Sequence, residues 1–200
     1  MKFINRVITL FAVLTLMFPS MATTSATTRV DELMEDMTLR QKATQLLMPD
    51  FRHWAQEGQS QVDFDVMNDE VAEILVEYDF GGVILFAQNV KETEQTTRLT
   101  DALQKAALDD NEGTGHSIPL LITIDQEGGI VTRLGTGTAL PGNMALGATG
   151  SKDHARSAGQ IIGRELSALG INVNLAPVLD VNNNPRNPVI GLRSYSSNPE

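Results

Sequence analysis

The sequence contains no cysteine and few aromatic side chains, which make up 5% of its 200 residues. The absence of cysteine excludes disulfide bonds, thiolate metal ligands, a cysteine nucleophile and the lipid-anchoring cysteine of an exported lipoprotein. Its three histidines stand in unrelated contexts, without the spacing of a metal site: His53, His116 and His154. The sequence therefore predicts neither a metal site nor a bound cofactor.

Positive charge is also scarce. The chain has 15 Lys and Arg against 25 Asp and Glu, which gives a formal net charge of -10. Proteins that bind the phosphate backbone of nucleic acids need clustered basic side chains, and no basic run occurs here. We therefore expect no nucleic-acid partner, and a neutral or cationic ligand fits this composition better.

Long apolar runs are missing as well, apart from one near the N-terminus. Lys2 and Arg6 precede roughly 12 apolar residues from Val7 to Phe18, and small residues follow. A membrane-spanning helix needs about 20 such residues. The three-part pattern predicts a secretory signal peptide over residues 1–26, with an uncleaved membrane anchor as the alternative. We therefore expect export to the periplasm or the medium, and no membrane span after the signal is removed.

The remainder alternates between helical and strand patterns. The spacing of apolar residues predicts helices over 30–48, 65–80, 90–108 and 151–169, and Thr38 with Gln41 forms a capping-box motif inside the first of them. Continuous apolar runs between these helices predict buried strands at 83–86, 120–124 and 171–181. The polar stretch 52–63 and the Gly- and Pro-containing stretch 132–150 are predicted to be loops or connections. Alternating strands and helices of this kind indicate a parallel α/β sheet.

Two parallel architectures are compatible with this order, a doubly wound sheet and a (β/α)8 TIM barrel. No GxGxxG or GxxxxGK[ST] motif follows a strand, which weakens the nucleotide-binding, doubly wound alternative. We therefore favour the barrel. A complete barrel needs roughly 250 residues, and only about four βα units can be counted here. We expect this chain to hold the N-terminal half or so of the barrel and to belong to a longer protein.

Charged residues cluster at the end of the strand in LLITIDQEGGIVTR, residues 120–133. Asp125 and Glu127 are two positions apart, so a continued strand would direct both carboxylates to one face, as a glycosidase or a metal site requires. The alternative is that one of them caps a helix or pairs with Arg133. Gly128 and Gly129 allow a sharp turn or a close approach of the backbone to a ligand. On residue types alone, both interpretations stay open.

Other polar residues are weaker candidates. Asp180 precedes an Asn- and Pro-rich turn, so a structural loop role is favoured for it. Arg193 lies in a later loop that would reach the same rim of the barrel, and by itself it indicates little. Trp54 is expected to pack against the core or an interface. No GxSxG motif supports a serine hydrolase.

Three segments together resemble the N-terminal barrel domain of glycoside hydrolase family 3, in its β-N-acetylhexosaminidase branch: IDQEGGIVTR, LPGNMALGAT and GRELSALGINVNLAPVLDVNNNPRNPVIGLRSYS. The resemblance runs from about Val30 to the last residue, so residues 27–200 are expected to be part of one barrel domain. It implies a retaining double displacement with an aspartate nucleophile and a His–Asp acid/base pair. It also implies a carbohydrate partner, an N-acetylglucosamine-containing glycan from peptidoglycan or chitin-type sugars. We expect a monomer when the protein is full length.

The resemblance assigns roles to individual residues. Asp125 matches the aspartate that holds sugar hydroxyls, Arg133 matches a second sugar-binding residue, and Arg193 matches the arginine of a later substrate-contacting loop. Glu127 is then a buried structural partner and not a catalytic acid. Ile130 stands where many relatives have arginine, so one polar contact is expected to be missing or replaced.

The catalytic groups implied by the resemblance are expected beyond Glu200. The Lys-His-Phe-Pro-Gly-like segment, the acid/base loop and the nucleophile have no counterpart within these residues, so residues 1–200 alone are expected to be inactive. Two alternatives stay open. One is a β-glucosidase or β-xylosidase of the same family, and the other is a non-catalytic carbohydrate-binding protein.

Overall fold

The computed structural model describes residues 28–55, 58, 60–109 and 117–199. The predicted signal peptide over 1–26 and His116 lie outside the described residues. The chain divides into two compact units, Met1–Asp36 and Met37–Glu200. The described part of the first unit is mainly helix α2 (Arg29–Asp36), and none of the residues of this helix is buried. The second unit holds the sheet and every predicted site residue.

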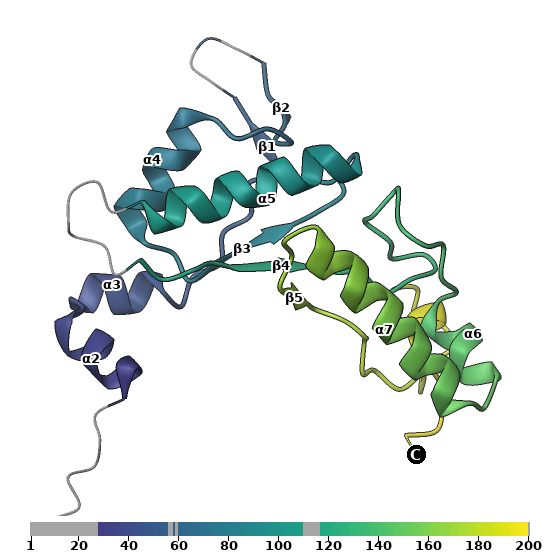
Figure 1. The fold of residues 1–200 in the computed structure, drawn as a ribbon. Coiled ribbons are helices and arrows are strands. Elements are labelled where there is room, and N and C mark those ends of the chain that lie inside the picture. The colour runs from purple at the N-terminus through teal and green to yellow at the C-terminus, as the bar shows by residue number, and fades with distance from the viewer. Residues whose placement is uncertain (1–27, 56–57, 59, 110–116, 200) are drawn as a thin grey trace, which may run out of the picture. The chain divides into compact units, whose positions relative to one another are not determined.

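The central sheet consists of three parallel strands, β3 (Gly82–Leu85), β4 (Leu121–Ile124) and β5 (Val173–Asn174), in the order β3-β4-β5 (Figure 1). A parallel bridge between Asp50 and Ile84 adds the preceding segment to the β3 edge. Spatial order therefore follows chain order. A barrel is wound in this sequential way, whereas a doubly wound sheet reverses direction at its switch point. The observed strand order therefore agrees with the barrel that the sequence predicted.

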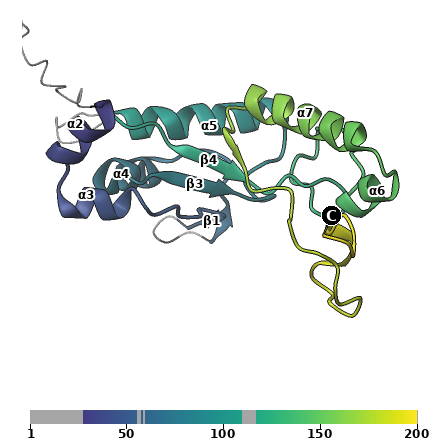
Figure 2. The ribbon, with the colours of Figure 1, turned by 90° about the horizontal axis from the view of Figure 1, so that it is seen from below.

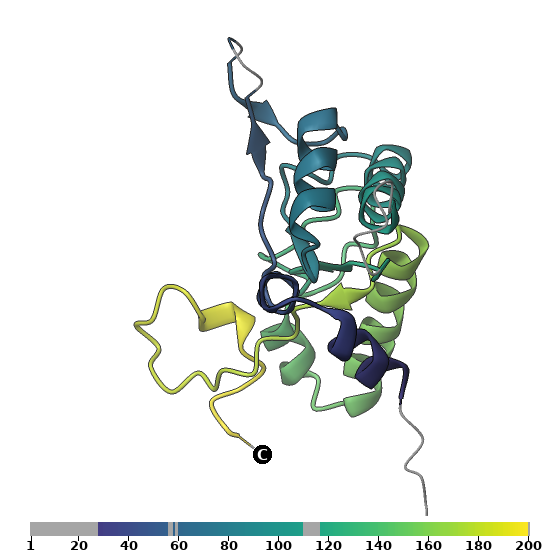
Figure 3. The same ribbon diagram turned by 90° about the vertical axis from the view of Figure 1, so that its left-hand side faces the viewer.

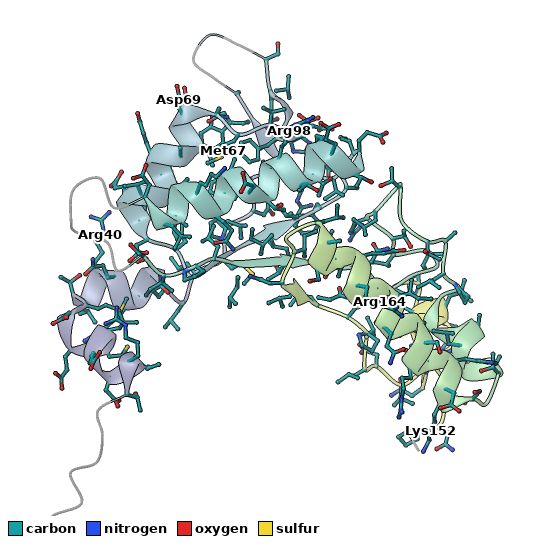
Figure 4. The ribbon with its side chains drawn as sticks, viewed as in Figure 1. Arg40, Met67, Asp69, Arg98, Lys152 and Arg164 are labelled. Carbon is teal, nitrogen blue, oxygen red and sulfur yellow. The ribbon has the colours of Figure 1, made fainter. Side chains whose placement is uncertain are left out.

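Three helices connect the strands and cover the sheet: α4 (Asp69–Tyr78), α5 (Thr93–Leu108) and α7 (Lys152–Ala168). Figure 2 shows α5 running alongside β3 and β4, and in Figure 3 α7 lies on the opposite side of β5 from the segment 180–199. Polar side chains of these helices point outward, as Arg98 and Arg164 do in Figure 4, and both residues are exposed. The helices therefore bury one face each, as the sequence periodicity predicted.

The core lies between this sheet and its helices. Ile122 and Ile124 of β4 are fully buried, and they belong to one apolar cluster with Leu99 and Leu103 of α5 and Leu166 of α7. Burying a side chain of this size contributes roughly 1.5–3 kcal/mol relative to leaving it in water. The strand that leads to the site is therefore anchored in the core by Ile122 and Ile124.

The first predicted helix is interrupted. The capping box is confirmed, because Thr38 and Gln41 bond reciprocally at the start of α3 (Leu39–Thr44). Its leucines do not enter the core: Leu39 and Leu46 are 83% and 86% exposed, whereas Thr44 is buried. A backbone hydrogen bond, and not apolar packing, attaches this helix to the rest of the unit. The Thr44 carbonyl accepts from the N–H of Gly81, so the helix docks on the turn before β3 through its backbone.

Three other predictions are corrected in detail. The stretch predicted as a loop forms a short antiparallel pair, β1 (His53–Trp54) with β2 (Val62–Asp63). The connection before α7 contains a six-residue helix, α6 (Asn143–Ala148). The strand predicted over 171–181 is shortened to β5, because the chain reaches Pro177, which cannot donate to a ladder. Within the described residues, no helix is long and apolar enough to cross a membrane.

Candidate functional site

The site is built on the loop that follows β4, and a buried glutamine anchors it. The Oε1 atom of Gln126 accepts hydrogen bonds from the backbone N–H groups of Arg133 (2.7 Å) and Leu134 (3.2 Å). The side chain of Asn174 in turn binds the Gln126 N–H and carbonyl, each at 3.0 Å. Gln126 is 2% exposed, so these bonds are shielded from water. The loop 125–134 therefore starts and ends at fixed points.

The paired glycines let this loop turn against the following segment. Gly128 and Gly129 have positive φ angles, 87° and 59°. A Cβ atom on Gly129 would lie 2.7 Å from the Cα of Gly142, and one on Gly128 would lie 2.9 Å from the Pro141 carbonyl oxygen. Both contacts are with backbone, which cannot rotate away. The predicted sharp turn is confirmed, and the atoms that approach these glycines closely belong to protein backbone.

We expect Gly129→Ala to destabilise the protein by about 2–4 kcal/mol, because it adds a backbone clash to the strain of a positive φ. Gly150→Ala is the matched control, since its φ is 61° but nothing lies within 4 Å of the added Cβ. That variant should cost only about 1–2 kcal/mol. Urea unfolding of both variants of the full-length protein measures the difference. Equal losses would show that the approach to Gly142 has no energetic importance.

Asp125 and Arg133 form the first charged pair. The Nη2 atom of Arg133 lies 3.4 Å from Oδ2 of Asp125, and both side chains are about a quarter exposed, at 26% and 27%. Part of each group therefore remains accessible to a ligand. The predicted alternative that an acid of this stretch pairs with Arg133 is confirmed, and the contact leaves the second carboxylate oxygen of Asp125 without a bond to this arginine.

Glu127 and Arg193 form a second, tighter pair. The Nη2 and Nε atoms of Arg193 donate to Oε1 of Glu127 at 2.6 and 3.1 Å, and Nε also reaches Oε2 at 3.1 Å. The Glu127 side chain is 3% exposed and that of Arg193 is 24% exposed. The hydrogen bonds that Arg193 donates to Glu127 raise the pKa of its guanidinium above the ordinary value, against the opposing effect of burial. Glu127 is thus a buried structural partner, as predicted.

The two pairs belong to one electrostatic cluster. The negative charges of Asp125 and Asp180 also raise the pKa of Arg193, after the larger contribution of Glu127. The structure therefore brings all three predicted substrate-binding residues, Asp125, Arg133 and Arg193, into the same charged region. The carboxylate can accept charge-assisted hydrogen bonds from neighbouring hydroxyls, and the guanidinium groups can donate such bonds to them, which is the chemistry of sugar recognition.

A cavity of about 320 Å³ lies next to this cluster, behind Glu127. Its lining comes mainly from α6, α7 and the segment after β5, and it contains neither Asp125 nor Arg133. It is therefore separate from the pair of Asp125 and Arg133, which is about a quarter exposed. Among the described residues, no group of three His, Asp or Glu side chains could hold a metal ion.

The weaker candidates lie elsewhere or have structural roles. The carbonyl of Asp180 accepts from the Ser194 hydroxyl at 2.6 Å, which ties the loop after β5 to the segment that carries Arg193. Trp54 packs against the core cluster, as predicted. The Nε2 atom of His53 lies 3.3 Å from Oδ1 of Asp63 at the surface.

Sequence reasoning missed two residues near the site, Arg52 and Phe86. Arg52 binds Asp50 through Nε and Nη2 at 3.2 and 2.9 Å, and its guanidinium lies over the ring of Phe86. The position of Phe86 at the end of a predicted strand was a signal, because site residues of barrels follow strand ends. Nothing local in the sequence indicated its partners.

Comparison with known proteins decides the family. The protein-family model described as "Glycosyl hydrolase family 3 N terminal domain" matches residues 38–200. The chain belongs to glycoside hydrolase family 3. The predicted (β/α)8 barrel class is thereby confirmed, and the described residues supply its sequentially wound parallel strands.

Individual relatives carry N-acetylhexosaminidase names. The chain is 44% identical over 173 residues to beta-hexosaminidase A of Pseudoalteromonas piscicida, covering 82% of this chain and 28% of that protein. A solved family 3 β-N-acetylglucosaminidase from Paenibacillus sp. str. FPU-7 is 46% identical with a TM-score of 0.70, over 82% of this chain and 28% of that one. A beta-N-acetylglucosaminidase/beta-glucosidase of Cellulomonas fimi is 46% identical over 81 residues, 40% of this chain and 14% of its own length. The chain thus spans less than a third of each.

Proposed function

We propose that the full-length protein hydrolyses terminal β-linked N-acetylhexosamine, chiefly N-acetylglucosamine, from glycans. The observation that carries the proposal is the charged cluster at the end of β4 in a family 3 chain. Asp125 and Arg133 are about a quarter exposed, and the buried carboxylate of Glu127 holds Arg193. Hydrogen bonds from such groups to sugar hydroxyls raise the rate when they strengthen in the transition state.

The roles proposed for this chain are in binding. Asp125, Arg133 and Arg193 hold the terminal sugar that the reaction releases. The nucleophile and the acid/base pair are supplied by residues beyond Glu200. The reaction proceeds by double displacement with retention of the anomeric configuration. Export from the cell, directed by residues 1–26, gives the protein access to peptidoglycan fragments or chito-oligosaccharides.

Hydrolysis of 4-nitrophenyl N-acetyl-β-D-glucosaminide by the full-length protein tests this proposal. We expect turnover with retention, read by proton NMR of the first-formed sugar anomer, and no turnover by residues 1–200 alone. Binding of N-acetylglucosamine without any hydrolysis would favour a carbohydrate-binding protein instead. Turnover by the 200-residue piece would contradict the assignment of the catalytic groups to later residues.

A β-glucosidase activity is the second candidate, favoured by the double name of the Cellulomonas fimi relative. The matching β-D-glucoside substrate distinguishes the two, because it lacks the 2-acetamido group and keeps the other hydroxyls. We expect kcat/KM for the N-acetylglucosaminide to exceed that for the glucoside. The reverse order would make the protein a β-glucosidase of the same family.

A further inference from the structure

Phe86 links two arginines at the rim of the barrel. The Cζ atom of Arg52 lies 3.6 Å from the centroid of the Phe86 ring, and the Cζ atom of Arg133 lies 5.6 Å from it. An aromatic face attracts a cation within about 6 Å through its quadrupole. The ring therefore joins the segment that carries Arg52 to the loop that carries Arg133.

The backbone of Phe86 is fixed by a buried asparagine. The Phe86 N–H donates to Oδ1 of Asn89 at 2.9 Å, and Nδ2 of Asn89 donates to the carbonyls of Phe64 (2.7 Å) and Phe51 (3.2 Å). Asn89 is 1% exposed, so these bonds are shielded from water. The base of the Phe86 side chain is therefore held where β3 ends.

Hydrogen bonds alone hold Arg133 loosely. Its contact with Asp125 is 3.4 Å long, whereas charge-assisted bonds are about 2.7–2.9 Å. Its Nε atom is buried and has no hydrogen-bond partner among the described residues. The Phe86 ring, with its centroid 5.6 Å from Cζ, is a further described group close to this guanidinium.

Arg52 does not displace Arg133 from the ring, because its own charge is compensated. Two donors of Arg52 bind the Asp50 carboxylate, and this interaction lowers the pKa of Asp50 and keeps that group ionised. Two neighbouring guanidinium groups would otherwise repel each other. The Asp50 carboxylate therefore allows both cations to share one aromatic neighbour.

We propose that Phe86 is a positioning residue for the sugar-binding pair Asp125–Arg133. The ring places the Arg133 guanidinium, and Arg133 in turn places the Asp125 carboxylate. Phe86 acts through Arg133 and does not contact the reacting atoms. This inference rests on the proposed function of that pair.

Substitutions of Phe86 in the full-length protein test the role. We expect Phe86→Leu to lower kcat/KM for 4-nitrophenyl N-acetyl-β-D-glucosaminide by roughly 3- to 30-fold, the range of a partly desolvated cation–π contact, and Phe86→Tyr to restore it within about twofold. Phe80→Leu is the matched control, because Phe80 lies before the same strand and stacks on Tyr78 at 5.4 Å. It should leave kcat/KM unchanged.

The decisive readout is coupling to Arg133. In an Arg133→Ala background, Phe86→Leu should change kcat/KM by less than about twofold, because the cation that the ring places is gone. A purely structural role would cost the same factor in both backgrounds and would overturn the proposal. Failure of the tyrosine variant to recover activity would overturn it as well.

The wild type, the two single variants Phe86→Leu and Arg133→Ala, and their double variant also separate this inference from the proposed function. If the wild type shows no turnover, the proposed function fails, yet the cycle can still be measured on the unfolding equilibrium constant. We expect a coupling factor of roughly 2- to 30-fold between Phe86→Leu and Arg133→Ala there. A coupling factor of one would refute the contact between the ring and the guanidinium independently of any activity.

Discussion

Replacing Asp125 with asparagine in the full-length protein should lower kcat/KM for 4-nitrophenyl N-acetyl-β-D-glucosaminide by about 10²- to 10³-fold. The change removes the negative charge from the side chain that we propose accepts from the sugar hydroxyls. Each hydrogen bond to a charged group contributes about 1.5–3 kcal/mol, and two such bonds account for the expected loss. The wild-type contact with Arg133 is long, at 3.4 Å, and the asparagine oxygen can still accept from that arginine, so the change should cost about 1 kcal/mol of stability.

Asp180→Asn is the control for this experiment. Asp180 also lies near Arg193, but its backbone carbonyl makes the tie to Ser194, and an asparagine retains that carbonyl. We expect it to keep kcat/KM within about threefold of the wild type, as for a weak exposed charge contact. Initial rates and thermal melts of both variants are the measurements. Equal losses in the two variants would mean that the loss reflects net charge at the rim and not a contact from Asp125.

The pair of Glu127 with Arg193 should respond asymmetrically to removal of either partner. Arg193→Ala leaves a carboxylate that is 3% exposed without its partner, which should cost about 3–5 kcal/mol. Glu127→Gln leaves a guanidinium that is 24% exposed and still bonded to the Val189 carbonyl, so about 1–2 kcal/mol is expected. Urea unfolding of the two variants measures both losses.

The double variant tests whether the two residues act together. Glu127→Gln with Arg193→Ala should be less unstable than the sum of the single changes by about 1–3 kcal/mol, because the buried charge is removed together with its partner. Glu127→Gln should also lower kcat/KM by roughly tenfold or more, since Arg193 loses the charged carboxylate that orients its guanidinium. Additive losses of stability in the double variant would contradict the burial of the carboxylate. A greater loss of stability from Glu127→Gln than from Arg193→Ala would contradict it as well.

Much of the fold was predictable because it depends on local periodicity. The apolar spacing located α5 and α7 within a few residues, and the capping box located the start of α3. The docking of α3 through the carbonyl of Thr44 could not be predicted, because the apolar spacing carries no signal for a backbone contact with Gly81. Helix α6 has only six residues and begins after Gly142, too short a segment for a periodic signal.

The site was predictable only where its partners are close in the sequence. Asp125 and Arg133 are eight positions apart, and their pairing was an open alternative from spacing. Glu127 and Arg193 are 66 positions apart, so no local pattern could match them, and the role of Glu127 came from family resemblance. The contact of Phe86 with Arg133 is non-local in the same way.

The most direct test of the account is a crystal structure of the full-length protein with bound N-acetylglucosamine. We expect sugar hydroxyl oxygens within about 2.5–3.2 Å of the Asp125 carboxylate and of the Arg133 and Arg193 guanidinium groups, with Glu127 still bound to Arg193. A sugar seated in the cavity of about 320 Å³ behind Glu127, out of reach of Asp125, would contradict it.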